Sequence, residues 1–402
     1  MDDQARVLLF YVDAGGGHRN VAQALDAAAE EQRMPWRFEA VNFQSVVARL
    51  DLTRRLTGRS SEGLYNLLLR REWTVTMVPL LRILHGLIRM RYRALVAQVA
   101  RYLAEQGPPP AAVLSVFPNF NAVIRDACRR ALPGVPMGVL VTDLADFPPH
   151  FWIEEGLDHV IVGSEEAEAQ ARAAGLSAES ITRVSGMALH PRFHANEEVG
   201  RVRAGMRAAM GFADTDLVIL LLFGGKGSPE VLRVAEGLLR ASPDWRVAVI
   251  CGDNPALLTR MQALKAAHGA RLHVTGFTSR VADYMRASDL LVTKPGPGSL
   301  AEAWHCRLPV VVAGNRQTIP QERFNVRYLT EQDLGIVVQR WSDVPAAVQA
   351  FVADAERQRR MRDNLGRLAP NRAVYEVLEL LDARVRGSGT RNRASATESR
   401  FR

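Results

Sequence analysis

The sequence has few cysteines and no long apolar run. Its three cysteines, Cys128, Cys251 and Cys306, stand far apart in the chain. Isolated cysteines provide neither a zinc-binding spacing nor a disulfide framework, which is typical of a chain that works in a reducing cytoplasm. No apolar stretch approaches the roughly 20 residues that cross a bilayer. The acidic N-terminus leads directly into a strand, so we expect no secretory signal.

Basic charge is concentrated in two parts of the chain. The formal net charge is +8, from 51 Lys and Arg against 43 Asp and Glu. Residues 49–101 hold eleven Arg against three acidic residues, a net +8, and residues 384–402 hold six Arg against one Glu, a net +5, so the rest of the chain carries −5. This distribution predicts a local anionic partner, and we expect no nucleic acid.

The bulk composition, 48% hydrophobic and 23% charged, is that of a soluble globular protein. A chain of 402 residues is long enough for two or three domains, each with its own core. We expect an N-terminal domain over 1–195 and a second domain over 196–370. A closing helix over 371–386 would pack back across the first domain, and the basic tail 387–402 is expected to be disordered.

One pattern occurs three times: a buried-type strand, a glycine turn and a helix. The strands are predicted at 7–12, 217–223 and 290–293, and they run into turns at 13–18, 224–228 and 294–298. Further strands are predicted at 111–117, 138–142, 159–162, 246–251, 273–275 and 309–313. These units predict an α/β protein with parallel sheets. The first turn lacks the GxGxxG spacing of dinucleotide-binding enzymes.

The turn at 294–298 is the most informative of the three. The following helix is expected over 299–306, with Ser299 as its N-cap and Glu302 at capping-box spacing. Unpaired first-turn N–H groups and the helix dipole favour an anion such as a diphosphate, and Glu302 would then accept hydrogen bonds from ribose hydroxyls. Glu302 can equally serve only to close the capping box, and the residues alone leave both interpretations open.

Lysine is scarce, with only Lys226, Lys265 and Lys294 in the chain, and two of these lie in glycine turns. Among so many arginines, a lysine retained in such a turn suggests phosphate contact, although chance placement gives the same pattern. The helix after the second turn is predicted from 229 to 241, with a proline at its favoured first position.

Two polar residues in the first domain suggest catalysis. His18 follows three glycines at the start of a helix predicted over 20–31, where the dipole favours the neutral imidazole that a general base requires. Asp143 follows a predicted strand, and ligands bind at the carboxyl ends of parallel strands. A capping or packing role is an equally good interpretation for each.

The segment 49–102 combines arginines with an amphipathic helix predicted over 79–103. A basic amphipathic segment suits the surface of an anionic bilayer. For the apolar stripe of the helix we favour ordinary core packing with a solvated basic flank.

Several stretches resemble, in the same order, motifs of the monogalactosyldiacylglycerol synthase family. These lipid glycosyltransferases are related to the enzyme that adds N-acetylglucosamine to the lipid-linked peptidoglycan precursor. The stretches are DAGGGHRNVAQAL, VTDLADFPPHFW, SGMALHPRF and TKPGPGSLAEA…LP…PQERFN. The resemblance covers most of residues 5–340. It implies the GT-B glycosyltransferase fold, in which two Rossmann-like domains face a cleft.

The resemblance also implies roles for individual residues. His18 becomes the base and Asp143 a residue that orients the base or the acceptor. Ser299 would touch phosphate, Glu302 ribose, and the Gln/Glu pair with Asn the sugar. The implied donor-binding set is Gly17, Gly225, Lys226, Phe277, Thr278, Gly298, Ser299, Glu302, Gln321, Glu322 and Asn325. His190 stands where the family commonly has Arg, which leaves that position without the family's side chain.

The reaction implied by the resemblance is an inverting transfer of galactose or glucose from a UDP-sugar to diacylglycerol. The enzyme would be cytoplasmic and peripheral on the inner face of the cell membrane. The residues expected to contact membrane or acceptor are Arg54, Arg55, Arg59, Arg70, Arg71 and Trp73. We expect no cofactor and no metal, because the DxD-like Asp214–Asp216 precedes its strand. Alternatives are transfer to another lipid acceptor, a UDP-sugar epimerase, or a non-catalytic nucleotide-sugar-binding protein.

Overall fold

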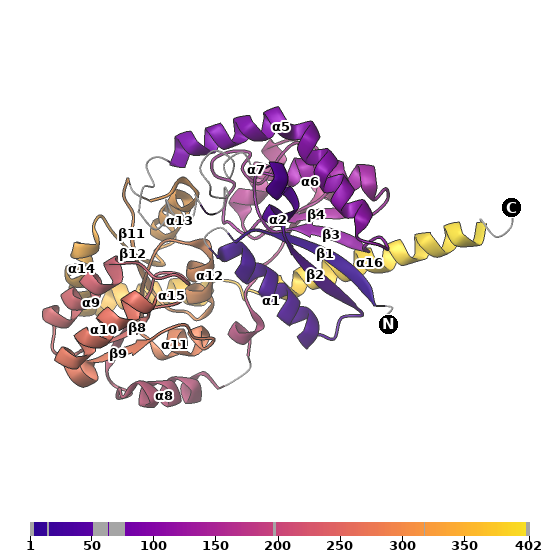
Figure 1. Cartoon of the computed structure of the whole chain (residues 1–402). Helices are drawn as coiled ribbons and strands as arrows, with labels where there is room; N and C mark the ends of the chain where they lie inside the picture. Colours follow the sequence, from indigo (N-terminus) through magenta and orange to yellow (C-terminus); the bar gives the residue numbers. More distant parts are fainter. Residues whose placement is uncertain are drawn as a thin grey trace. The chain divides into compact units, whose positions relative to one another are not determined.

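The computed structural model describes residues 4–13, 16–50, 63, 77–195, 198–316 and 318–398. The chain forms two compact units (Figure 1). Unit 1 comprises Met1–Pro191 and Asn371–Arg402, and unit 2 comprises Arg192–Pro370. The first boundary lies four residues before the predicted one, and the second coincides with it.

Unit 1 is built on a six-stranded parallel sheet in the order β2-β1-β3-β4-β5-β6. Its strands are β1 Ala5–Tyr11, β2 Trp36–Asn42, β3 Ala112–Ser115, β4 Met137–Leu140, β5 Val160–Val162 and β6 Ile181–Arg183. Its helices are α1 Gly17–Glu31, α2 Phe43–Val47, α5 Met77–Glu105, α6 Asn121–Ala131, α7 Glu165–Ala173 and α16 Ala373–Glu398, with short 3-10 turns η1 Ala48–Leu50 and η3 Ala178–Ser180. The 3-10 turn η4 Pro191–Phe193 spans the boundary, with Arg192 and Phe193 in unit 2.

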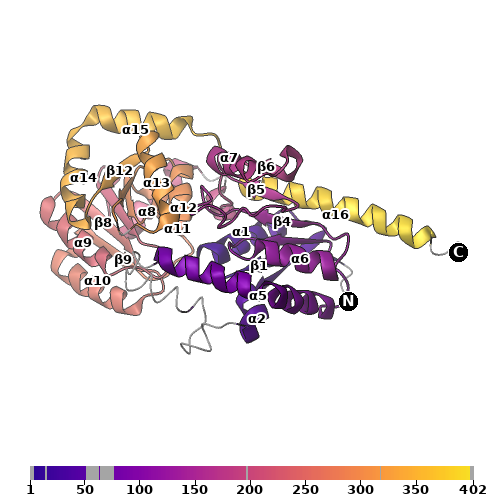
Figure 2. The same ribbon diagram turned by 90° about the horizontal axis from the view of Figure 1, so that it is seen from above.

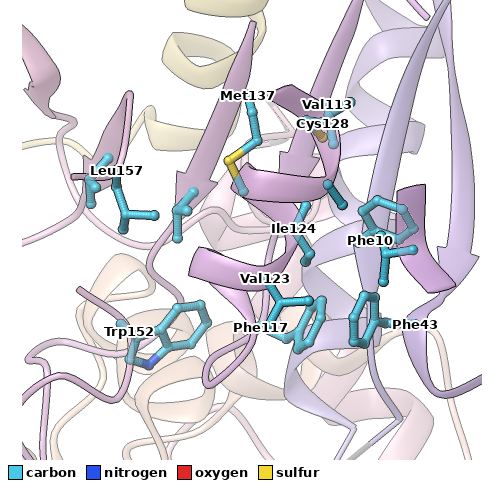
Figure 3. Close-up of a cluster of buried hydrophobic side chains, with 14 of the residues drawn as sticks. Phe10, Phe43, Val113, Phe117, Val123, Ile124, Cys128, Met137, Trp152 and Leu157 are labelled. Carbon is cyan, nitrogen blue, oxygen red and sulfur yellow. The ribbon is translucent and has the colours of Figure 1, made fainter. Parts of the chain in front are cut away.

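Alternate residues of β1 enter two different cores, as the two-residue period of a strand requires. Leu8 and Phe10 join the cluster under α2, α5, α6 and α7, where Phe10 meets Phe43 edge to face (Figure 3). Val7 and Leu9 join the cluster under α1 and α16 on the opposite face. The carboxy-terminal helix therefore packs on the first unit, as predicted, and Figure 2 shows α16 running along that unit.

Unit 2 repeats the architecture with the strand order β12-β11-β10-β7-β8-β9, again all parallel. Its strands are β7 Leu217–Leu222, β8 Trp245–Ile250, β9 Leu272–Thr275, β10 Leu290–Thr293, β11 Val310–Ala313 and β12 Gly335–Val338. Its helices are α8 Val199–Met210, α9 Glu230–Ala241, α10 Pro255–His268, α11 Val281–Ala287, α12 Pro297–His305, α13 Pro320–Glu331, α14 Val344–Ala353 and α15 Ala355–Arg367, with η5 Gly269–Arg271 and η6 Trp341–Asp343.

Two helices differ from their predicted bounds in ways that matter. α16 continues to Glu398, so the disorder expected for 387–402 is not found over 387–398. α5 begins at Met77 and ends at Glu105, close to the predicted 79–103. Within the described part of the chain, no helix combines the length and apolar character needed to cross a membrane.

Candidate functional site

The three strands that carry the site of unit 2 lie side by side in its sheet. β10 pairs with β7 on one side and with β11 on the other, all in parallel. The loops at 224–228, 294–298 and 314–319 therefore all leave the same edge of the sheet. This is the edge at which open α/β sheets bind ligands.

The helix after the 294–298 turn begins two residues earlier than predicted. Gly296 is the N-cap of α12, Pro297 is its first residue, and no side chain caps this end. The capping box predicted for Ser299 and Glu302 is therefore wrong, because Ser299 already lies inside the first turn. Leu300 donates the first helical hydrogen bond to the Gly296 carbonyl at 3.1 Å. The N–H groups of Gly298 and Ser299 precede it, which is the arrangement that accepts an anion.

The helix α13 brings two buried amide side chains to this turn. Gln321 is 6% exposed and Asn325 is 1% exposed. Asn325 Nδ2 donates to the Pro295 carbonyl at 2.8 Å, which ties α13 to the glycine turn. Glu322 lies close by, since a Cβ on Gly296 would come within 3.5 Å of Glu322 Oε1.

These amides are incompletely paired. Both polar atoms of the Gln321 side chain, and Oδ1 of Asn325, are buried with no hydrogen-bond partner among the described residues. A buried polar group left unpaired costs roughly 1–3 kcal/mol of stability. Such groups need a functional explanation, and donors and acceptors of this kind match the hydroxyls of a sugar.

Glu302 lies half-buried in α12, one turn beyond Ser299. Burial raises the pKa of its carboxyl to about 7, against the opposing effect of the Arg192 charge. A carboxylate poised near neutral pH accepts hydrogen bonds from hydroxyl groups only in part of the physiological range. The protonation state of Glu302, and with it its capacity to accept hydrogen bonds, therefore changes with pH near neutrality.

The glycine turn after β7 packs tightly against the next loop. A Cβ on Gly252 would come within 2.2 Å of the Gly225 carbonyl, so only glycine fits at 252. Asn254 Nδ2 donates to the Lys226 carbonyl at 3.1 Å, which holds the backbone of the turn. The side chain of Lys226 is half-buried at the sheet edge used by α12.

Phe277 and Thr278 follow β9, at the same edge. Phe277 is 77% exposed, so its ring is not part of the core of unit 2. Thr278 Oγ1 accepts from the Arg280 backbone N–H at 3.1 Å. An exposed aromatic ring at the ligand-binding edge offers a flat surface on which a planar base can stack.

In unit 1, His18 lies in the first turn of α1 and is held by two residues that follow the strands β3 and β4. Its Nδ1 is 3.0 Å from Thr142 Oγ1, and the ring also hydrogen-bonds the Val116 carbonyl. Burial lowers the pKa of His18 to about 4, so the imidazole is neutral at pH 7. The sequence had predicted the neutral form from the helix dipole, whereas burial is the larger cause. Gly17, the first residue of α1, is exposed beside it.

Asp143 reaches His18 only indirectly. Its Oδ2 accepts from Trp152 Nε1 at 2.7 Å, and the Trp152 ring meets the His18 ring edge-on at a centroid distance of 5.5 Å. Burial raises the pKa of Asp143 to about 6, with the charge of Asp146 adding to the effect and the Trp152 hydrogen bond opposing it. Asp146 in turn accepts the backbone N–H of Trp152 at 2.7 Å. The structure thus gathers His18 and Asp143 around one buried tryptophan.

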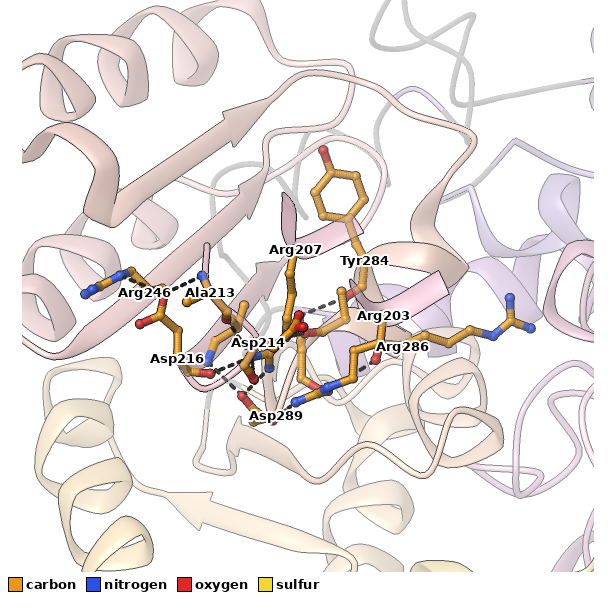
Figure 4. Close-up of polar contacts among 12 residues, drawn as sticks. Arg203, Arg207, Ala213, Asp214, Asp216, Arg246, Tyr284, Arg286 and Asp289 are labelled. Carbon is orange, nitrogen blue, oxygen red and sulfur yellow. Dashed lines mark hydrogen bonds and ion pairs between the residues drawn. The ribbon is translucent and has the colours of Figure 1, made fainter. Parts of the chain in front are cut away.

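The DxD-like Asp214–Asp216 has a structural role (Figure 4). It precedes β7, at the edge opposite to the ligand loops. The Asp214 and Asp216 carbonyls each accept from the fully buried Arg207 at 2.7 Å, and the Asp216 carboxylate pairs with Arg246 at 3.2 Å.

Two residues of these clusters escaped the sequence analysis. Thr142 was noted only as the end of a strand, yet its hydroxyl contacts His18 directly. Arg192, two residues after His190, carries the charge that opposes the pKa shift of Glu302. Their contacts depend on tertiary structure: Thr142 lies two residues after β4, and Arg192 lies in the 3-10 turn η4. Arg54, Arg55, Arg59, Arg70, Arg71 and Trp73 lie outside the described residues.

Comparison with known proteins identifies the relatives of this chain. Residues 219–372 match the glycosyltransferase family 28 C-terminal domain. Monogalactosyldiacylglycerol synthase 1 of Arabidopsis thaliana is 27% identical over 98% of this chain and 74% of its own length. The processive diacylglycerol beta-glucosyltransferase of Bacillus subtilis is 26% identical over 67% of this chain and 68% of its own.

Solved structures show the same fold. MurG of Acinetobacter baumannii aligns with a TM-score of 0.56 at 12% identity, covering 94% of this chain and 99% of that one. HepE of Anabaena, solved with UDP-glucose, aligns with a TM-score of 0.51 at 13% identity, covering 96% of this chain and 99% of that one. The predicted GT-B fold is confirmed. The chain is therefore a glycosyltransferase, homologous to the monogalactosyldiacylglycerol synthases.

Proposed function

We propose that this enzyme transfers galactose or glucose from a UDP-sugar to diacylglycerol at a membrane surface, with inversion at the anomeric carbon. The observation that carries the proposal is the set of buried, unpartnered atoms of Gln321 and Asn325 beside the uncapped end of α12. The relatives from Arabidopsis and Bacillus, named as transferring sugars to diacylglycerol, support the same acceptor.

On the donor side, each part of the ligand has a chemically matched partner in unit 2. The first-turn N–H groups of α12 and the ammonium of Lys226 match a diphosphate. Glu302 matches the ribose hydroxyls, and Phe277 with Thr278 matches the uracil. Gln321, Glu322 and Asn325 match the hydroxyls of the hexose. UDP-glucose in the Anabaena structure of the same fold agrees with this donor class.

On the acceptor side, His18 is the base. Neutral imidazole has one N–H and one lone pair, and the Val116 carbonyl can only accept, so the ring keeps a lone pair for a proton. The glycerol hydroxyl attacks the anomeric carbon, its proton passes to His18, and the bond from that carbon to the diphosphate oxygen breaks. The fixed N–H donors of α12 stabilise the charge that appears on the departing UDP.

The surface of α5 supports contact with an anionic membrane. Ile83 is 59% and Met90 is 74% exposed, and seven residues separate them, so they share one face of the helix. Arg89 and Arg93 are exposed around Met90. Exposed apolar side chains flanked by arginine suit the interface of an anionic bilayer. These residues support the proposal that the enzyme is a peripheral protein on the inner face of the cell membrane.

One assay tests the proposal directly. The protein is incubated with UDP-galactose or UDP-glucose and vesicles of diacylglycerol and anionic phospholipid, and the glycolipid is identified by mass and chromatography. We expect a monohexosyl diacylglycerol with one of the two donors. Release of UDP without a glycolipid, or conversion of the UDP-sugar to its epimer, would replace this proposal with hydrolysis or epimerisation.

The absence of a metal requirement is a separate part of the proposal. Backbone N–H groups and Lys226 supply the positive potential that a divalent cation supplies elsewhere. We expect transfer to continue in the presence of a chelator. Activity that is lost on chelation and restored by a divalent cation would contradict this.

A further inference from the structure

Arg192 joins two parts of the donor site that are far apart in the sequence. It lies in η4, two residues after the position where the resemblance leads one to expect an Arg and the chain has His190. Its Nη1 donates to the Ser279 carbonyl at 2.8 Å. Ser279 follows Phe277 and Thr278 in the loop after β9. The bond therefore fixes to η4 the loop that carries the exposed Phe277 ring.

The same guanidinium acts on Glu302 in α12. Its positive charge favours the ionised carboxylate against the effect of burial. From the neighbouring α11, Arg286 and Asp283 face the end of α12 near Cys306, and these two form an ion pair at 3.9 Å. On α12 itself, His305 Nε2 donates to the Phe193 carbonyl at 3.0 Å. Burial raises the pKa of Cys306, the C-cap of α12, to about 12, which keeps that thiol neutral.

We propose that Arg192 is a positioning residue of the donor site, which holds the loop 277–279 in place through the Ser279 carbonyl and directs a positive charge at Glu302. The inference rests on the proposed function, in which Glu302 accepts the ribose hydroxyls. It assigns to this chain a linker arginine displaced by two residues from His190. The side chain of Arg192 does not have to touch the reacting atoms for this role.

Two conservative variants separate the charge from the hydrogen bond. Arg192→Lys keeps the positive charge, and Arg192→Gln keeps a donor for the Ser279 carbonyl but loses the charge. UDP binding is measured by calorimetry from pH 6 to 8.5 for each variant and for the wild type. Ionisation of UDP itself is common to all, so the ratio of affinities at each pH reports on the protein. Thermal unfolding checks that each variant is folded.

We expect Arg192→Lys to follow the wild-type pH profile. In Arg192→Gln, the pH at which UDP binding is half-lost rises by about one unit, and affinity at pH 7 falls about fivefold. The shift should disappear when Arg192→Gln is combined with Glu302→Gln, because the group that titrates is then absent. A wild-type profile for Arg192→Gln, or a loss that is equal at every pH, overturns the inference. A wild-type protein that does not bind UDP overturns the proposed function itself.

Discussion

The two units share one architecture, yet their polar clusters differ in how completely they are paired. In unit 1, His18, Asp143 and Trp152 are linked by hydrogen bonds and ring contact to one another or to Thr142. In unit 2, Gln321 has no partner for either polar atom among the described residues, and Asn325 lacks one for Oδ1. The first cluster is complete as it stands, whereas the second lacks the groups that would satisfy it.

This difference follows from the chemistry proposed for each unit. A general base must be neutral and correctly oriented before the acceptor arrives, so its neighbours are part of the protein. A sugar pocket must instead exchange its hydrogen bonds for those of the ligand. Atoms that are buried and unpaired are a cost in the free protein and a gain when hydroxyls arrive. The comparison predicts opposite responses to substitution in the two clusters.

The largest expected effect is on the base. Removal of the imidazole in His18→Ala should lower glycolipid formation about 10³-fold, because proton transfer by a positioned base contributes roughly 10²–10⁴-fold. UDP binding should be unchanged, because His18 belongs to unit 1 and the nucleotide site to unit 2. Steady-state rates and calorimetry measure the two quantities. A rate within tenfold of wild type would remove His18 from the reaction.

The second prediction reverses the usual effect of a core substitution. Gln321→Leu removes two unpaired buried atoms, so the free protein should gain about 1 kcal/mol of stability, visible as a melting temperature a few degrees higher. The same change should weaken UDP-galactose or UDP-glucose binding about tenfold and leave UDP binding unchanged, since only the sugar loses contacts.

Asn121→Leu in unit 1 is the matched control. Asn121 is also buried, but its Oδ1 accepts from Ser115 Oγ at 2.7 Å and its Nδ2 donates to the Trp152 carbonyl at 3.0 Å. This substitution takes the Asn121 donor away from the Trp152 carbonyl and leaves Ser115 Oγ with its longer bond to the Phe117 carbonyl at 3.3 Å, so it should destabilise the protein by about 2 kcal/mol. If both variants lose stability alike, Gln321 is paired in solution and the contrast between the clusters fails.

The sheets could be predicted from the sequence except at three of their four edges, since the edge strand β9 was predicted at 273–275. Every central strand was recognisable as a short run of Val, Leu and Ile. The strands that were missed, β2, β6 and β12, all lie at an edge of a sheet. Trp36–Asn42 mixes Arg and Glu with apolar residues, and Ile181–Arg183 is only three residues long. These two strands are partly solvated, so their sequences lack the continuous apolar run on which the prediction depended. The apolar β12 Gly335–Val338 has no such explanation.

The candidate site could be predicted where it depends on residues that are close in the sequence, and not where it depends on packing. Buried Gln321 and Asn325, the uncapped turn and neutral His18 all lie at positions that the motifs indicated. The helix start at Pro297 was missed, because the Ser299–Glu302 spacing imitates a capping box. Thr142 and Arg192 act through tertiary contacts, and nothing in their local sequence distinguishes them.

The pH dependence of turnover sharpens the comparison within unit 1. His18, with a pKa near 4, stays neutral across the ordinary range and contributes no titration near pH 6.5. Asp143, with a pKa of about 6, is charged above that pH and protonated below it. At saturating donor we expect the rate to fall as the pH drops through about 6. Asp143→Asn should remove this acidic limb, and a limb that persists belongs to another group.

The smallest effect is expected at Thr142, which orients His18 without taking part in proton transfer. Thr142→Val preserves the shape of the side chain and removes the hydroxyl 3.0 Å from His18 Nδ1. Loss of one neutral hydrogen bond costs about 1 kcal/mol, which corresponds to about a fivefold lower rate. Thr142→Ser keeps the hydroxyl and should retain most of the activity. A loss in Thr142→Val as large as that of His18→Ala would show that the hydroxyl itself handles the proton, and the base would then be a pair of residues.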